Sequence, residues 1–79
     1  MATETQQVKQ VVTTALERFG AEPDDITPDA TFEALAIDSL DLAELSQIVE
    51  DEFGVRLTSA DVAGVKTVGE AIDLIASRG

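Results

Sequence analysis

Apolar residues recur at helical spacing near the start of the chain. Those that fit one face of a helix are Val8, Val11, Val12, Ala15, Leu16 and Phe19. Their separations of three and four residues are typical of an amphipathic helix with one buried stripe. The pattern predicts a helix over residues 4 to 19. We expect Thr3 or Thr5 to cap its start and Gly20 to end it in a left-handed turn.

A second helical pattern begins at Ser39 and runs to about Phe53, where Gly54 should end it. Its inward stripe is formed by Leu42, Leu45, Val49 and Phe53, with Ile48 beside it. Asp38 is suited to cap the helix, and Asp41 stands at capping-box spacing from it. An Asp-Ser-Leu-Asp helix start is common, so ordinary capping is one interpretation of this stretch.

The capping-box spacing occurs twice more, at Thr58 to Asp61 and at Thr67 to Glu70. The first predicts a helix of about five residues stopped by Gly64. The second precedes an apolar face made by Val68, Ala71, Ile72 and Ile75, in a last helix ending near Ser77. No segment shows a strand pattern. The predicted fold is all-α: a small four-helix bundle of three main helices and a short third one.

A long connection of seventeen residues separates Gly20 from Asp38. Pro23 and Pro28, each followed by aspartate, suit the first central position of a turn. The apolar residues of the segment are Ile26, Phe32, Leu35 and Ile37. We therefore expect a loop that lies across the bundle. Connections of this length are often functional, although a purely structural link between two helices explains this one equally well.

Composition narrows the classes of function. The 79 residues fit a single domain, 1–79, and 44% hydrophobic residues suffice for a folded core. The chain contains no cysteine and no histidine, which excludes disulfides, thiol nucleophiles, imidazole bases and nearly every zinc site. We predict no catalytic residues and no metal site. The N-terminus lacks signal-peptide features and no stretch reaches membrane-spanning length, so we expect a soluble, cytoplasmic monomer.

The charge is strongly acidic, with a formal net value of −11. Such a surface disfavours nucleic acid and favours partners with basic patches, although solubility alone is an alternative explanation. The outward side of the second predicted helix carries Asp41, Glu44, Asp51 and Glu52 without a basic residue. We interpret this face as a docking surface rather than a merely solvated one. Self-repulsion should also make stability depend on salt.

Four stretches together resemble the acyl carrier proteins of fatty acid and polyketide synthesis. They are Leu35 to Asp41, Glu44-Leu45, Glu50 to Val55 and Lys66 to Ala71. In that family the serine matching Ser39 bears 4′-phosphopantetheine on its hydroxyl. The resemblance implies a non-enzymatic role, in which acyl intermediates are held as thioesters on the arm. A helix start suits this attachment, because free N–H groups and the positive helix end stabilise a phosphodiester.

The resemblance also implies partners. Asp38, Leu40, Asp41 and Glu44 are the expected recognition residues. The partners would be a phosphopantetheinyl transferase and then acyltransferase, ketosynthase and other synthase enzymes with basic docking patches. An alkyl cargo would gain from shelter between the helices. The candidates for lining that space are Leu45, Ile48, Val49, Val62, Ala71 and Ile72.

Some positions depart from the common pattern of the family. Ala36 stands where glycine often occurs, and Ala43 and Gln47 replace larger apolar residues. The identity of the cognate synthase is therefore open. Asp41 and the Glu44-Leu45 pair favour the fatty acid type slightly over the discrete polyketide type. Alternatives are an aminoacyl or peptidyl carrier and an unmodified small acidic interaction protein; a calcium-binding regulator and an enzyme are weaker.

Overall fold

Helices form most of the structure, a computed structural model that describes residues 4–78. In chain order they are α1 (Thr5–Arg18), the 3-10 turn η1 (Pro23–Asp25), α2 (Ser39–Phe53), α3 (Ser59–Ala63) and α4 (Val68–Arg78). Between residues 4 and 78 there is no strand; an isolated bridge joins Thr31 and Thr67. The predicted all-α bundle with a short third helix is confirmed.

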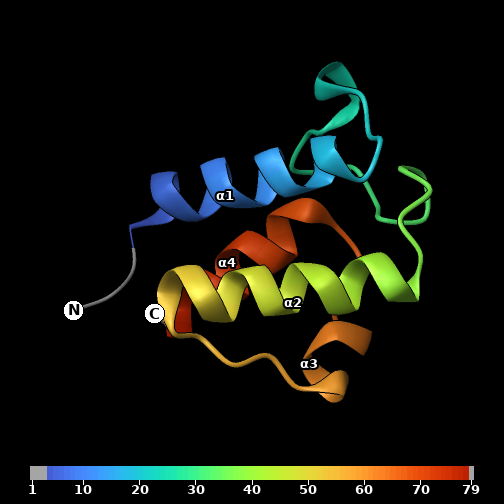
Figure 1. The fold of residues 1–79 in the computed structure, drawn as a ribbon. Coiled ribbons are helices and arrows are strands. Elements are labelled where there is room, and N and C mark those ends of the chain that lie inside the picture. Colours follow the sequence, from blue (N-terminus) through green and yellow to red (C-terminus); the bar gives the residue numbers. More distant parts are fainter. Residues whose placement is uncertain (1–3, 79) are drawn as a thin grey trace.

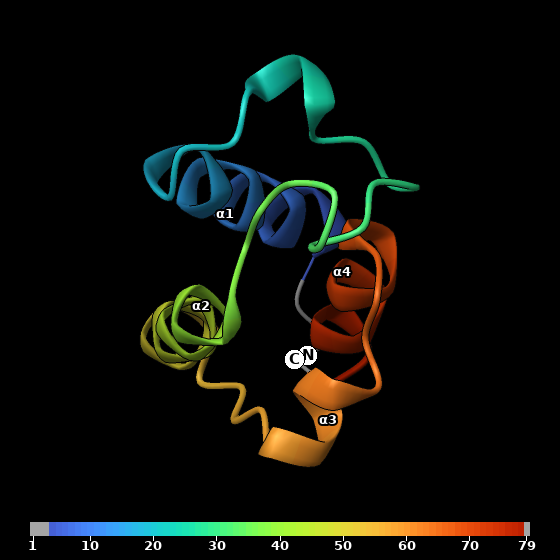
Figure 2. The same ribbon diagram turned by 90° about the vertical axis from the view of Figure 1, so that its right-hand side faces the viewer.

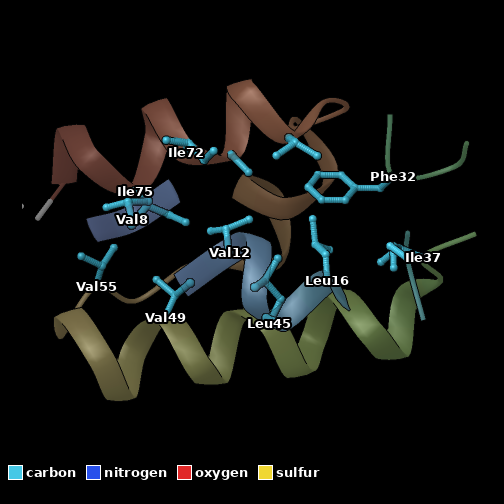
Figure 3. Close-up of a cluster of buried hydrophobic side chains, with 14 residues drawn as sticks. Val8, Val12, Leu16, Phe32, Ile37, Leu45, Val49, Val55, Ile72 and Ile75 are labelled. Carbon is cyan, nitrogen blue, oxygen red and sulfur yellow. The ribbon is translucent and has the colours of Figure 1, made fainter. Parts of the chain in front are cut away.

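Helices α1, α2 and α4 surround the core, and α3 lies below α2 and α4 (Figures 1 and 2). The α1 stripe is buried at Val8, Val12, Ala15 and Leu16, and α2 contributes Leu45 and Val49. Helix α4 adds Val68, Ala71, Ile72 and Ile75. Figure 3 shows these side chains meeting between the helices. Helix α3 has no buried residue, so it covers the bundle without belonging to its core.

The end of α1 follows the prediction, whereas its start does not. The N–H of Gly20 donates to the Glu17 carbonyl, and that of Ala21 donates to the Leu16 carbonyl, both at 3.0 Å. With Gly20 at φ 108° this is a Schellman turn, closed by the buried Leu16 and Ala21. The predicted Thr5 cap is wrong, because Glu4 precedes the helix in extended backbone and forms no side-chain cap. Thr3 lies outside the described residues.

The long connection crosses the bundle as predicted, running from α1 to the start of α4 and back to α2 (Figure 2). Pro23 and Pro28 each hold the first central position of a hydrogen-bonded turn. Phe32 and Ile37 are buried. The carbonyls of Pro28 and Ala30 accept from the first N–H groups of α4, at 3.0 and 2.9 Å. The loop backbone therefore serves as part of the cap of α4.

Gly69 makes this junction possible. Its N–H donates to the Pro28 carbonyl at 3.0 Å, and a Cβ added at Gly69 would lie 2.9 Å from the same oxygen. That separation is too short for a side chain, so the loop would have to move. The other predicted boundaries agree closely: α2 begins at Ser39 and ends before Gly54 at φ 70°, and α4 extends one residue past Ser77.

Candidate functional site

The start of α2 presents Ser39 to solvent. Asp38 precedes the helix in extended backbone, and its Oδ1 accepts a hydrogen bond from the Asp41 N–H at 2.9 Å. Its carbonyl accepts the first helical bond from Leu42 at 3.0 Å. Ser39 is the first helical residue and is exposed. Asp38 therefore caps the helix, and the Ser39 hydroxyl takes part in none of the side-chain hydrogen bonds of the described residues.

Asp41 does not complete the predicted capping box. The hydrogen bonds of the described residues include the one from the Asp41 N–H to Asp38 but not the reciprocal one from the Asp38 N–H to the Asp41 carboxylate. The same box is complete at α3, where Thr58 and Asp61 bond each other in both directions. The Asp41 carboxylate is thus not used in capping α2.

The surface around Ser39 combines one apolar side chain with acids. Leu40 is 79% exposed and is the one large hydrophobic residue so exposed within residues 4–78. Glu44 is exposed one turn further along α2, and Asp41 is half-buried between them. In the same part of the chain the one ion pair joins Asp61 to Arg78, so these acids have no basic neighbour in contact. The surface beside Ser39 thus consists of one exposed apolar side chain bordered by negative charge.

A groove of about 620 Å³ leads from Ser39 along the boundary between α2 and α3. It leads toward an inner cavity between α2, α3 and α4, and the two share Leu42, Ser46, Leu57, Val62 and Val65 as lining residues. The cavity holds only about 20 Å³ of free space, room for about one water molecule. The groove and the cavity therefore adjoin along these shared residues, and Ser39 lines the groove.

Three of the six predicted lining residues border the inner cavity, namely Leu45, Val62 and Ala71. Ile48 faces a different groove, between α1 and α2. Val49 and Ile72 belong to the packed core. The prediction missed the other residues around the cavity, among them Phe32, Leu57 and Val65, which lie outside the helices and whose inward direction depends on how the loops fold back.

A clamp holds α3 against the end of α4. Both nitrogens at the tip of Arg78 donate to the Asp61 carboxylate, at 2.5 and 2.7 Å. Asp61 Oδ2 also accepts from the Thr58 N–H at 2.9 Å. The hydrogen bonds from Arg78 and then from Thr58 lower the pKa of Asp61 from 3.8 to about 2. Sequence reasoning found the capping spacing but not Arg78, which is seventeen residues away.

The turn before α2 contains an unusual backbone conformation. Ala36 has φ 59°, the one non-glycine residue with positive φ in the described chain. The Ile37 N–H donates to the Phe32 carbonyl at 2.9 Å, and the Ala36 N–H donates to the Glu33 carbonyl at 3.1 Å. This is a Schellman turn with alanine at the left-handed position. The geometry explains why glycine suits that position.

The chain matches a known family over residues 6–75, and the family is described as a phosphopantetheine attachment site. The match spans nearly all of the 79 residues. The protein belongs to the phosphopantetheine-binding carrier family. It is a carrier protein that bears 4′-phosphopantetheine covalently on a serine. Carriers of this kind work with a phosphopantetheinyl transferase and with synthase enzymes.

Three serines of the carrier lie within the matched span. Ser46 is half-buried inside α2, and its hydroxyl donates to the Leu42 carbonyl at 3.0 Å. Ser39 and Ser59 are both exposed at the first position of a helix. Ser39 begins a helix of fifteen residues and Ser59 one of five. The choice of attachment residue therefore lies between these two helix starts.

Metal-binding clusters and membrane-spanning helices are absent from the part of the carrier that the structure describes. No three acidic side chains gather there as a metal site. None of the helices in residues 4–78 combines the length and the apolar character needed to cross a membrane.

Proposed function

We propose that this protein is an acyl carrier whose arm is attached to Ser39. The observation that carries the proposal is the exposed position of Ser39 at the first turn of α2, where it lines the groove that adjoins the apolar cavity. Beside it stands the single exposed leucine, Leu40. The residue that follows Ser59 is Ala60 rather than a leucine, and Ser59 lies on a helix of only five residues. The Ser39 end thus offers both an attachment point and a surface that partners can recognise.

The first turn of α2 fits a phosphodiester at Ser39. The N–H groups of Ser39 and Leu40 precede the first helical hydrogen bond and point away from the helix, so they are available to phosphate oxygens. The Asp41 N–H is already bonded to Asp38. When bound, the arm supplies a terminal thiol that holds acyl groups as thioesters. The carrier itself would catalyse no step.

The acids near Ser39 would act in recognition. Asp38 and Asp41 are negatively charged and lie near the position where the phosphate would be attached, so they repel it rather than hold it, and Glu44 extends their charge along α2. Together with Leu40 they form a surface suited to an enzyme with an apolar socket and a basic rim. The first such enzyme is the transferase, followed by acyltransferase, ketosynthase and other synthase enzymes. This assignment makes Asp38, Leu40, Asp41 and Glu44 the proposed recognition residues.

The inner cavity suits a hydrocarbon cargo. Its lining is apolar except for Ser46 and Asp61. Sheltering each methylene gains about 0.8 kcal/mol. A saturated alkyl chain uses such a lining better than a chain rich in carbonyl groups, because buried carbonyls need donors. We therefore favour the fatty acid type over the discrete polyketide type, with an aminoacyl or peptidyl carrier as the alternative.

Intact mass tests the attachment. The protein is incubated with coenzyme A, magnesium and a broad-specificity phosphopantetheinyl transferase, alongside Ser39→Ala and Ser59→Ala. We expect the mass of one arm on the wild type and on Ser59→Ala, and none on Ser39→Ala. Modification of Ser39→Ala would show that the arm is attached to another residue. A known carrier in the same tube shows that the transferase is active, so that no gain on any variant would refute the proposal.

Acyl chains of increasing length test the cargo assignment. The arm is loaded with acetyl, butyryl, hexanoyl or octanoyl groups, and the melting temperature is measured for each. If the cavity shelters the chain, the melting temperature should rise with chain length, because more apolar surface leaves water in the folded state alone. Equal melting temperatures across the series would contradict sequestration while leaving the attachment at Ser39 intact.

A further inference from the structure

A second groove, the α1–α2 groove, has a volume of about 430 Å³ and lies between α1 and α2. Its lining residues from α2 are Ile48, Asp51 and Glu52, none of which lines the groove beside Ser39. Ile48 follows Ser39 by nine residues, about two and a half helical turns, so it lies on the opposite side of α2. In Figure 2, where α2 is seen end on, α1 is above it and α3 is below it. A molecule in the α1–α2 groove would therefore leave the Ser39 groove open.

The α1–α2 groove has an apolar floor and a polar rim. Val11 and Ile48 are half-buried, and Ala15 is buried. The other lining residues are all exposed: Gln10, Thr14, Arg18, Asp51 and Glu52. An amphipathic helix binds such a surface by laying apolar residues, three or four positions apart, onto the floor. The shape and lining of the groove therefore suit a helix.

The two helices that form the groove differ in charge. Helix α1 has two basic residues and one acid, whereas α2 has five acids and no basic residue. Within residues 4–78 the one ion pair is that of the α3 clamp, so Lys9 and Arg18 of α1 are in none. Arg18 lines the α1–α2 groove, and Lys9 lines an adjoining hollow that shares Gln10 and Thr14 with it. Positive charge on α1 thus stands across the groove from negative charge on α2.

These charges also give the groove a direction. Helices α1 and α2 run antiparallel (Figure 1), and the groove extends from Gln10 to Arg18 along α1 and from Ile48 to Glu52 along α2. Arg18 therefore lies toward one end of the groove, and Glu52 lies toward the other. Because a helix is positive at its N-terminus and negative at its C-terminus, a bound helix is favoured with its N-terminus beside Glu52. Its C-terminus then lies beside Arg18.

A second copy of this chain is not the occupant that the charges favour. Each copy has a net charge of −11, so two copies repel each other. A twofold dimer would bring Arg18 of each copy to the acids of the other. Exposed ion pairs of this kind contribute little and would not offset the repulsion. A partner that is less acidic than the carrier is favoured instead.

We propose that the α1–α2 groove binds a helix of a partner protein while an enzyme acts at Ser39. The helix places an apolar stripe on Val11 and Ile48. Basic side chains near its N-terminus face the acids of α2, and an acidic side chain near its C-terminus faces Arg18. The partner can hold the carrier without covering the arm, because the two grooves lie on opposite sides of α2. The site goes beyond the proposed attachment and does not depend on it.

Two helical peptides of equal composition test the site. Each is kept helical by a hydrocarbon staple and carries the same leucine and isoleucine stripe. The first has lysines in its first turn and glutamates in its last turn, and the second has these exchanged, so both have the same net charge. We expect the first to bind about five-fold more tightly in fluorescence anisotropy titrations. In amide NMR spectra it should shift Val11, Thr14 and Ile48 but neither Leu40 nor Val62.

Charge reversal at one end of the groove tests the direction of binding. Arg18→Glu should weaken binding of the first peptide about five-fold and abolish the preference between the two. Arg56→Glu makes the same change in net charge at an exposed residue outside the groove and should keep the preference. Equal binding of both peptides to the wild type would overturn the proposal, as would the absence of groove shifts at about 1 mM peptide.

Two further measurements separate the alternatives. Sedimentation of the carrier alone should show a monomer; a dimer whose formation shifts Val11 and Ile48 would assign the groove to a second copy and overturn the partner helix. Arm transfer to Ser39 should keep its rate when the first peptide is bound, and slower transfer would overturn simultaneous binding. Failure of the arm to attach at Ser39 would refute the proposed function but would not change the peptide affinities.

Discussion

The starts of α2 and α3 are built alike and surrounded differently. Each has a capping side chain, a serine at the first helical position and an aspartate three residues after the cap. At α3 that aspartate, Asp61, is bonded to Thr58 and Arg78. At α2 it is Asp41, whose carboxylate takes no part in the cap and lies beside the exposed Leu40. The aspartate three residues after the cap thus helps to fix α3, whereas the carboxylate of its counterpart in α2 is not used to hold the fold.

The comparison shows that a helix-start motif does not define a functional serine. Ser39 differs from Ser59 in its neighbours, which are an exposed leucine and acids that form no ion pair within the described residues. Ser59 lines the same groove from the other side.

The largest effect should come from reversing charge near Ser39. Glu44→Lys should slow modification by the transferase about ten-fold at low salt, because it weakens attraction to a basic partner. Asp73→Lys makes the same charge change on an exposed position of α4 and should leave the rate close to that of the wild type. Initial rates of arm transfer, measured by mass at several salt concentrations, check the pair. Equal slowing in both variants would mean that only net charge matters.

The two Schellman turns give opposite predictions for stability. Ala36→Gly should raise the free energy of unfolding by about 1 kcal/mol, because it relieves a left-handed alanine. Gly20→Ala should lower it by about the same amount, since its surroundings leave room for a Cβ and the cost is in the backbone alone. Urea unfolding measures both. A loss of stability in Ala36→Gly would show that the turn is not strained.

The clamp at α3 predicts a dependence on acid. The pKa of Asp61 in the folded protein is about 2, below its ordinary 3.8. Its contribution to stability is therefore complete above pH 3.8 and is lost as the pH falls through about 2. Asp61→Asn and Arg78→Ala should both lose stability less steeply than the wild type across this range. Thermal unfolding at closely spaced pH values checks this, and parallel curves for all three proteins would refute it.

The smallest effect concerns salt. The net charge of −11 leaves repulsion among acids such as those on α2, and only Asp61 of the described acids is in an ion pair. Added sodium chloride should raise the melting temperature by screening this repulsion. Glu44→Lys should respond less than the wild type, because it has less repulsion to screen. A melting temperature independent of salt in the wild type would show that the repulsion is already balanced.

Most of the fold could be predicted because its signals are local. The spacing of apolar residues located the helices, and Gly20 and Gly54 marked two of their ends, since glycine is preferred in left-handed turns. The position of Ser39 followed from the same signals. The cap of α1 could not be predicted as well, because Thr3 and Thr5 both stand at possible cap positions, and Thr5, which the structure describes, does not cap the helix.

The features that sequence could not reveal depend on contacts between distant residues. Arg78 meets Asp61 only because α3 folds back against the end of α4. Phe32 reaches the cavity only because the loop is bonded to the start of α4. Ala36 was visible as a departure from the family pattern, but its strain could be recognised only from the backbone angle. The local sequence pattern predicted the helix start at Ser39, whereas the contacts around it could be seen only in the structure.

Helix α3 contributes no buried residue, so its local opening can occur separately from the unfolding of the whole bundle. Because α3 is held by its cap and by Arg78 rather than by the core, it should open locally while α1, α2 and α4 remain packed. Its amides should exchange with deuterium well before those of the core helices. Under the proposed sequestration of an acyl chain beside α3, the free energy of opening α3 is then distinct from the free energy that keeps the bundle folded. A protein engineer could therefore tune how readily this carrier releases its cargo without changing its resistance to heat.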